Sequence, residues 1–347
     1  MSDHVILPNG LTLPRTSKKS GNTFTPWLGV NPPFIHKNLL EIVEVDKNIS
    51  ESNTLALDAL NNGASSLWFN LKDHRDIPKL LENIRLDIAP VHISGNLHPE
   101  DILKAFKSLP KSQNQHLWHG SINIDPFKNA ISNGRWFSGS AHEDISRFNL
   151  KIPQNVRSIC SNANCIPNNN VIDQVAFTIS SLIIQLDILG WNNSDRCLVF
   201  LKSQSNYLET IAMTQAIRIL WRSILEKNNR LDSSLWICGE TSLQTHEDPA
   251  QQLISRGIEA QSLWLGGCNE IVIHPVDSSS KAKQWARDQF LILAYETGLT
   301  REKDILKGSY LIDEWSEKII LASKEKINKW VNNHSFIKEI ENETLWE

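Results

Sequence analysis

The chain has 347 residues, a net charge of −4 and 40% hydrophobic residues. This composition is typical of a soluble globular protein with a large core, built as one large α/β domain or two medium ones. The mild acidity argues against nucleic acid as the main partner, because a phosphate-binding surface needs clustered Lys and Arg. Apolar runs such as SSLIIQLDILG (180–190) are interrupted by polar residues and are too short to span a bilayer. We therefore expect neither nucleic acid nor membrane as a partner.

The N-terminal segment has no pattern typical of a packed element. MSDHVILPNG lacks the basic start and long apolar stretch of a signal peptide. Without an export signal, the five cysteines predict reduced thiols and a cytoplasmic location. Pro, Gly, Ser and Thr are frequent up to about residue 35, so we assign residues 1–50 to an extended arm and a first helix.

After the arm, apolar runs of strand length alternate with amphipathic helical stretches. Short apolar strands joined by helices predict parallel pairing, with both faces of the sheet covered. About eight such units predict a closed (β/α)8 TIM barrel, which we place over residues 51–330, with a C-terminal helical tail over 331–347. The expected strands cover residues 65–71, 88–94, 120–127, 156–161, 196–203, 233–240 and 269–275, with a weak eighth over 298–305.

Two helices are well specified. Residues 173–190 keep helical apolar spacing, and Gly190 suits the C-terminal cap. In residues 205–227, Asn206 and Glu209 have the spacing of a capping box, with Asn in place of Ser or Thr. We expect both segments to cover the barrel.

No motif identifies a reaction on its own. Cys160 and Cys165 form C-x4-C, which is not a zinc spacing, so ordinary buried or loop thiols are favoured over a metal or redox site. HEDP (246–249) is favoured as a helix start, with the Asp before Pro, and KDHRD (72–76) as a charged loop tip. Among the eleven histidines, His274 is slightly favoured, because it ends an expected strand, where barrel active sites lie.

Several segments resemble the barrel of methylmalonyl-CoA mutase, particularly its smaller, non-catalytic subunit. TSLQTHEDPAQQLISRGIEAQSLWLGGCNEIVIHPVD (241–277) follows the family's order of helix start, helix and strand, and KGSY (307–310) resembles its GGSY segment. Residues 205–227 resemble the helix after strand five, 55–71 the first helix and strand, and 122–134 the small-subunit form of strand three. Together these segments cover most of residues 55–317.

The resemblance implies a degenerate active site. In catalytic subunits, strand four carries a Tyr-His pair that steers the radical and hydrogen-bonds the substrate carbonyl, and the matching positions here are Asn162 and Ala163. Catalytic strand seven reads Gly-Gly-Thr-Gln-Ser-Leu-His-Thr, whereas this chain has GGCNEIVI (266–273). Asn269 therefore replaces the glutamine and Val272 the histidine. The arginine for coenzyme A, expected near strand six, has no counterpart in SSLWICGETSL (233–243).

The resemblance also bears on the cofactor. The family's cobalamin domain carries an Asp-x-His-x-x-Gly motif whose histidine ligates cobalt, and this sequence contains no such motif. We therefore expect that this chain alone binds no cofactor and that adenosylcobalamin belongs to a partner chain. The chain is then either a natural short subunit or a piece of a longer one.

Two functions follow from the resemblance. The favoured one is a structural subunit in a heterodimer with the catalytic large subunit of methylmalonyl-CoA mutase, an isomerase that interconverts methylmalonyl-CoA and succinyl-CoA. The alternative is an active acyl-CoA mutase barrel that uses a cobalamin domain on a separate chain; radical control there would need positioned polar or aromatic groups. An unrelated barrel hydrolase or lyase would need an acid/base set that we do not find.

Two features bear on binding. Retained binding of an acyl-CoA or another ligand stays open at the barrel mouth, where the candidate residues are Asn162, Lys202, Thr241 and His274. The segment Pro26–Phe34 and the 12 tryptophans fit a large apolar contact surface, since aromatic residues are enriched at interfaces.

Overall fold

The computed structural model describes residues 4–6, 11–14, 37–45, 48–95, 99–109, 118–123, 125–149, 156–166, 170–243, 248–300, 305–306, 308–332 and 335–345. The arm segment Pro26–Phe34 lies outside these ranges, as do parts of the HEDP and KGSY motifs.

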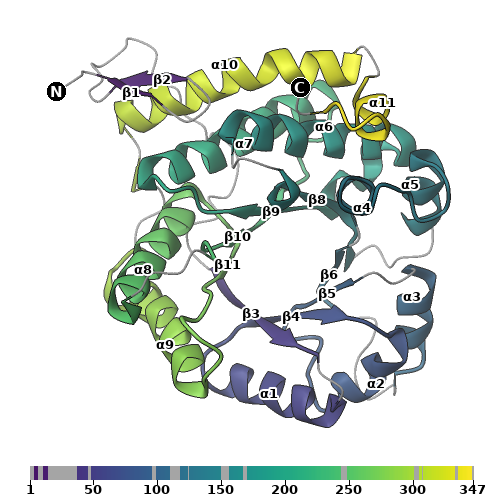
Figure 1. Cartoon of the computed structure of the whole chain (residues 1–347), viewed down its shortest axis with the longest axis vertical. Helices are drawn as coiled ribbons and strands as arrows, with labels where there is room; N and C mark the ends of the chain where they lie inside the picture. The colour runs from purple at the N-terminus through teal and green to yellow at the C-terminus, as the bar shows by residue number, and fades with distance from the viewer. Residues whose placement is uncertain are drawn as a thin grey trace.

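Nine of the described strands form one parallel ring, which confirms the expected (β/α)8 TIM barrel (Figure 1). The chain itself closes the ring at Ser158, because β7 pairs with β6 on one side and β8 pairs with β9 on the other. Around the ring the strands are β3 (Asn38–Glu44), β4 (Ser66–Leu71), β5 (Val91–Gly95), β6 (Gly120–Asn123), β7 (Val156–Arg157) with β8 (Ile159–Asn162), β9 (Cys197–Lys202), β10 (Trp236–Glu240) and β11 (Glu270–Val272).

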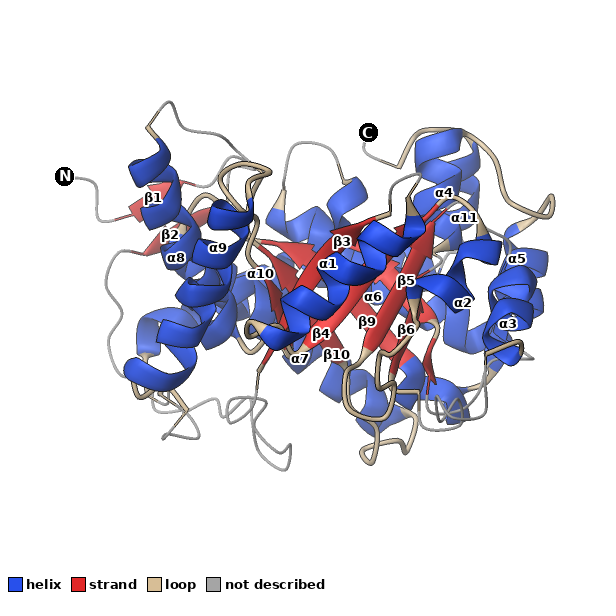
Figure 2. Ribbon diagram, turned by 90° about the horizontal axis from the view of Figure 1, so that it is seen from below, coloured by secondary structure: helices blue, strands red, loops and turns tan. Residues whose placement is uncertain are grey.

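Helices surround this ring on its outer side, as the view from below also shows (Figure 2). They are α1 (Ile49–Asn61), α2 (Ile77–Leu80), α3 (Pro99–Lys107), α4 (Pro126–Asn133), α5 (Ala141–Asn149), α6 (Val171–Leu189), α7 (Tyr207–Lys227), α8 (Pro249–Gly266), α9 (Ser280–Leu291) with the π-helix η7 (Ile292–Glu296), α10 (Tyr310–Asn332) and α11 (Phe336–Glu341). Parallel strands covered on both faces are expected to be apolar throughout, and β9 is buried at every position before Lys202.

Side-chain caps fix where the barrel helices begin. Asn206 accepts hydrogen bonds from the backbone N–H groups of Leu208 at 2.9 Å and Glu209 at 3.3 Å, which confirms the expected start of α7. Asp248 accepts from the N–H of Ala250 at 2.9 Å and precedes the Pro that opens α8, so the Asp-Pro pair of HEDP is a helix start.

The structure corrects the expected strand list in one place. The eighth strand, expected over 298–305, is wrong for the described part of that segment, where residues 299, 300 and 305 form turns and residue 298 has no regular structure. The eighth strand of the ring is instead β3, which pairs with β4 and β11. It therefore lies inside the range 1–50 that the sequence assigned to the arm and first helix. Glu41 and Glu44 interrupt its apolar pattern. The Glu41 carboxylate is neutralised by Arg287, a residue of α9, at 2.6 Å.

Further elements lie outside the ring. The short antiparallel hairpin β1 (His4–Ile6) and β2 (Thr12–Pro14) contacts α10, where Trp315 Nε1 donates to the Pro14 carbonyl at 2.9 Å. Helix α10 packs along α6 and α7 (Figure 1). Helix α6 is long and apolar enough to cross a membrane by length and composition, unlike the shorter run considered in the sequence, but most of it is buried inside the protein.

Candidate functional site

The carboxyl ends of the parallel strands meet at one end of the ring, where barrel enzymes carry their active sites. Asn162, Lys202 and Glu240 are the last residues of β8, β9 and β10, and Lys202 pairs with Glu240 in the register. Thr241 follows β10 directly, and His274 comes shortly after β11. The four candidates named from the sequence, Asn162, Lys202, Thr241 and His274, therefore all lie at this mouth.

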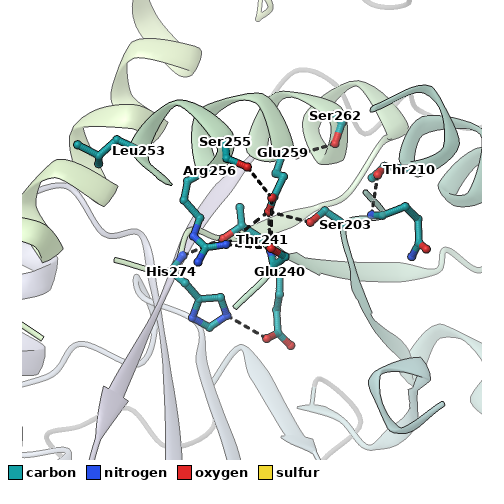
Figure 3. Close-up of polar contacts among 12 residues, drawn as sticks. Ser203, Thr210, Glu240, Thr241, Leu253, Ser255, Arg256, Glu259, Ser262 and His274 are labelled. Atoms are coloured by element: carbon teal, nitrogen blue, oxygen red, sulfur yellow. Dashed lines mark hydrogen bonds and ion pairs between the residues drawn. The ribbon is translucent and has the colours of Figure 1, made fainter. Parts of the chain in front are cut away.

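A chain of hydrogen-bonded side chains crosses the mouth. Glu240 Oε2 lies 3.2 Å from His274 Nε2 (Figure 3). Glu240 Oε1 accepts from Asn164 Nδ2 at 2.8 Å. The His274 backbone N–H donates to Thr241 Oγ1 at 3.0 Å, which holds the segment after β11 against β10. A His–Glu pair can transfer protons. However, the cavity that His274 lines measures only about 50 Å³, which is too small for a metabolite.

Behind the mouth, α8 is anchored to the ends of β9 and β10. The Glu259 carboxylate accepts from Ser203 Oγ at 2.9 Å, from the Ser242 backbone N–H at 2.5 Å and from Ser255 Oγ at 3.2 Å (Figure 3). Arg256 Nη1 donates to Ser242 Oγ at 3.0 Å. Because these partners satisfy the carboxylate, the cluster positions the helix rather than presenting a reactive group.

The two positions matched to the catalytic Tyr-His pair take part in local backbone structure. Asn162 Oδ1 accepts from the Asn164 N–H at 3.0 Å and caps the 3-10 turn η4 (Ala163–Cys165), while the Asn162 N–H donates to Asp125 at 2.7 Å. Ala163 is only 1% exposed. The Cys165 thiol donates to the Asn162 carbonyl at 3.1 Å. The Asn162 oxygen is thus used by the backbone, and Ala163 has no polar side-chain atom.

The two cysteines of this stretch are not poised as metal ligands. Burial raises the pKa of the Cys160 and Cys165 thiols, so both keep their protons. Among the residues that the structure describes, no three His, Cys, Asp or Glu side chains are grouped as a metal site would require.

The strand-seven positions are separated by the length of β11. Asn269 precedes the strand, at the end of the ring away from the mouth, and its Oδ1 accepts from Arg218 Nη2 at 2.7 Å and from the Ile237 N–H at 2.9 Å. Val272, at the other end of the strand, is buried. The structure therefore does not bring Asn269 together with the other positions that the sequence matched to catalytic residues.

The barrel interior is filled by apolar side chains, which we call the lumen cluster. The rings of Trp68 and Phe200 lie 4.6 Å apart between their centroids. A TIM barrel interior packed in this way is a core rather than a channel. The lumen cluster consists of Leu40, Cys160, Leu198, Phe200, Cys238 and Val272, with Ile42, Trp68 and Trp236 packed against them.

Beneath the lumen cluster lies a buried Glu–His pair. Glu270 and His92 are 0% and 1% exposed, and His92 Nε2 lies 3.0 Å from Glu270 Oε2. Trp236 Nε1 and the Cys238 thiol also donate to Glu270 Oε2, each at 3.0 Å. Burial alone would raise the pKa of Glu270, but His92 and these donors outweigh it and lower the pKa to about 2.

A pocket of about 460 Å³, which we call the mouth pocket, opens on the β4 to β8 side of the mouth. Asn162 is the one sequence candidate among its lining residues. The pocket is lined by Ile42, Trp68, Asn70, Ser94, Gly95, Asn123, Asp125, Lys128, Asn129, Ser132, Asn133, Phe137, Cys160 and Asn162.

Sequence reasoning missed Asn123, Glu240, His92 and Glu270. The first two could have been found, because each is the last residue of a strand, where side chains gather at the mouth. His92 and Glu270 lie early in β5 and β11, and their pairing depends on ring closure between segments far apart in the sequence. No pattern in the local sequence predicts that contact.

Comparison with known proteins agrees with this architecture. A family model described as methylmalonyl-CoA mutase matches residues 69–345. The chain belongs to this family. The methylmalonyl-CoA mutase small subunit of Porphyromonas gingivalis is 25% identical over 318 residues, covering 80% of this chain and 49% of that protein. A methylmalonyl-CoA mutase of Rhizobium meliloti is 29% identical over 168 residues, covering 43% of this chain and 23% of that protein. The chain thus spans about half the length of the small subunit that it matches, and less of the second relative.

Solved structures with a similar course of the chain include dihydropteroate synthases. The synthase of Xanthomonas albilineans aligns with a TM-score of 0.38 and 12% identity, over 76% of this chain and 94% of that one. The synthase of Yersinia pestis aligns with a TM-score of 0.38 and 12% identity, over 83% of this chain and 99% of that one.

Proposed function

We propose that this chain is a non-catalytic subunit that binds a catalytic methylmalonyl-CoA mutase chain as a heterodimer. The observation that carries the proposal is the state of the two positions matched to the catalytic Tyr-His pair. Asn162 is committed to capping η4, and Ala163 is buried without a polar group. A barrel that must control a radical needs positioned groups at such places. The similarity to a small subunit supports the same assignment.

The lumen cluster gives independent support. Trp68 and Phe200 pack against each other inside the ring, and Val272 stands where the resemblance expects a histidine. An acyl-CoA that entered along the axis would have to displace these rings, at the cost of their burial. The alternative of an active acyl-CoA mutase barrel therefore lacks both the reacting groups and the space on the axis.

The residues present do not fit cobalamin as a resident cofactor. A histidine that ligates cobalt needs an accessible imidazole nitrogen. Both ring nitrogens of the buried His92 are engaged, by Ser121 and Glu270, and His274 Nε2 faces Glu240. Among the strand-end and lumen residues that the structure describes, none is arranged to hold the cofactor. We therefore assign adenosylcobalamin to the partner chain.

The experiment is a turnover assay with defined components. The purified chain is mixed with adenosylcobalamin and methylmalonyl-CoA, and formation of succinyl-CoA is followed with and without the catalytic chain. We expect no product from this chain alone and no stoichiometric change in the cobalamin absorbance spectrum. Succinyl-CoA formed without the catalytic chain would overturn the proposal and support the active-barrel alternative.

The cellular location is part of the same proposal. All five cysteines are free thiols, and four of them are buried. Free thiols persist in a reducing compartment, so we propose that the assembly works in the cytoplasm. Fractionation of the native cells, with this chain followed by immunoblot, tests that location.

A further inference from the structure

The mouth pocket is chemically unlike the rest of the barrel mouth. Its volume of about 460 Å³ lies within the range of small-molecule sites. Two aromatic rings, Trp68 and Phe137, lie on its wall, and amide and hydroxyl groups supply most of its other functional groups. The amides are those of Asn70, Asn123, Asn129, Asn133 and Asn162, and the hydroxyls those of Ser94 and Ser132.

The charges at this pocket disfavour an ionic ligand. Asp125 already accepts from the N–H groups of Phe127 at 2.9 Å, Lys128 at 3.0 Å and Asn162 at 2.7 Å. Lys128 is the one cationic lining residue and is exposed to solvent. An anion would therefore meet a nearby buried carboxylate and a single screened ammonium. A neutral ligand with several hydroxyls suits the wall better, because the rings cover apolar faces and an amide has two N–H donors and two acceptor lone pairs. An amide that is already bonded, such as Asn133 Nδ2 to Asn129 Oδ1 at 2.7 Å, therefore keeps capacity for a hydroxyl.

One lining residue connects the pocket to the barrel interior. The Asn123 side-chain oxygen accepts from Ser121 Oγ, and Ser121 Oγ lies 2.7 Å from His92 Nδ1. His92 Nε2 in turn faces Glu270. Asn123 Nδ2 is buried and has no hydrogen-bond partner among the residues that the structure describes. A buried unpaired donor is costly, so Asn123 gains from a rotation that gives this donor an acceptor.

We propose that the mouth pocket binds a small uncharged polyhydroxylated ligand, of about the size of a monosaccharide, and that Asn123 transmits its occupancy to the buried His92–Glu270 pair.

The coupling follows from the polarity of the hydrogen bonds. While Ser121 donates to Asn123, the Ser121 oxygen must accept from His92 Nδ1–H, because a hydroxyl has one proton. A ligand oxygen that draws Asn123 Nδ2 toward the pocket turns the amide and releases the Ser121 hydroxyl. Ser121 keeps accepting from His92 Nδ1–H, but its hydroxyl no longer donates to Asn123, so the Nδ1–H bond weakens and the ring nitrogen signal shifts without any proton leaving the ring. Asn123 and Ser121 are positioning residues in this scheme.

The test uses the full chain with histidine labelled in the ring with nitrogen-15. Glucose, N-acetylglucosamine and myo-inositol are the neutral probes, glucose 6-phosphate is the anionic probe, and pantetheine is a neutral amide chain without a polyol ring. Affinity is measured by calorimetry, and the His92 ring signals are followed by NMR. We expect at least one neutral polyol to bind and to shift the His92 signals, with weaker binding of its phosphorylated form.

Three variants separate binding from coupling. Asn123→Leu should weaken the polyol about tenfold through loss of the amide contacts. Asn133→Ala, on the exposed end of α4, should weaken it about threefold without a risk to folding. Ser121→Ala lies outside the pocket lining and should bind the polyol within about twofold of the parent affinity while losing the His92 response. Ser161→Ala, a buried strand serine paired with Ser181, is the matched control and should change neither readout.

The outcomes decide both halves of the proposal. Binding of pantetheine or glucose 6-phosphate without any neutral polyol would overturn the ligand assignment, as would the absence of any binding. Polyol binding that leaves the His92 signals unchanged, or a His92 response that persists in Ser121→Ala, would overturn the coupling.

Discussion

Replacing Glu270 by Gln tests whether the buried pair stabilises the barrel. The substitution keeps the size of the side chain and an acceptor oxygen, but it removes the charge that faces His92 at 3.0 Å. The pKa of Glu270 is lowered from 4.5 to about 2, which corresponds to a stabilisation of roughly 3 kcal/mol. Removing one partner of a buried ion pair costs about 3–5 kcal/mol in other proteins. Glu270→Gln should therefore lower the free energy of unfolding by about 3 kcal/mol near neutral pH.

The pH dependence of the free energy of unfolding provides a second test, because its direction can be predicted. Because the folded-state pKa of Glu270 is depressed, its stabilisation is present above the unfolded pKa and is lost as pH falls from 4.5 toward about 2. Between pH 4.5 and about 2, the parent chain should lose the stabilisation that Glu270 provides. Glu270→Gln lacks this stabilisation and should not show the corresponding loss. The two chains should therefore converge in stability at low pH.

The assay is equilibrium urea unfolding, followed by circular dichroism at several pH values. His92→Gln and the double variant complete a double-mutant cycle, in which the pair should show a coupling energy above about 1 kcal/mol. A Glu270→Gln chain within about 0.5 kcal/mol of the parent at neutral pH, or a coupling energy near zero, would refute the assigned role of the pair.

Three further results are expected. Asp248→Ala removes the N-cap of α8 and should cost about 1 kcal/mol in urea unfolding, and a loss below 0.3 kcal/mol would contradict the assigned cap. Burial raises the pKa of Glu209 to about 7, so the folded chain binds a proton there between 4.5 and 7 and loses stability as pH rises through that window. Glu209→Gln should remove this dependence and be more stable than the parent above pH 7, as thermal melts at two pH values would show. Asn162→Tyr with Ala163→His should yield no mutase activity and a lower melting temperature, because a buried alanine site has no room for an imidazole; succinyl-CoA formation would contradict this.

The sequence predicted the barrel because its evidence is local and repeated. Apolar strands alternate with helices whose starts are marked by caps such as Asn206 and Asp248, and both caps are confirmed. The first strand escaped notice because Glu41 and Glu44 interrupt its apolar pattern, and the partner of Glu41, Arg287, lies far along the chain. A short stretch of sequence cannot show that a charge is neutralised by a residue far along the chain.

The candidate site was predicted only in part, for a related reason. The position of His274 followed from the end of an expected strand, but its partner Glu240 and the link to Asn164 appear only when β8, β10 and β11 are brought together. Asn269 was aligned with a catalytic glutamine, yet it lies before β11 and binds Arg218. A residue's place along a short strand decides which end of the barrel it faces, and alignment of residue types does not resolve that.

The central claim, that this chain is a non-catalytic subunit, is tested most directly by the mass of the complex that it forms. The chain is coexpressed with a full-length methylmalonyl-CoA mutase catalytic chain from the same organism, purified through a tag on this chain alone, and measured by size-exclusion chromatography with light scattering. The account predicts one species whose mass equals the sum of the two chains. Elution of the two chains as separate species, with no shared peak at any concentration tested, would contradict it.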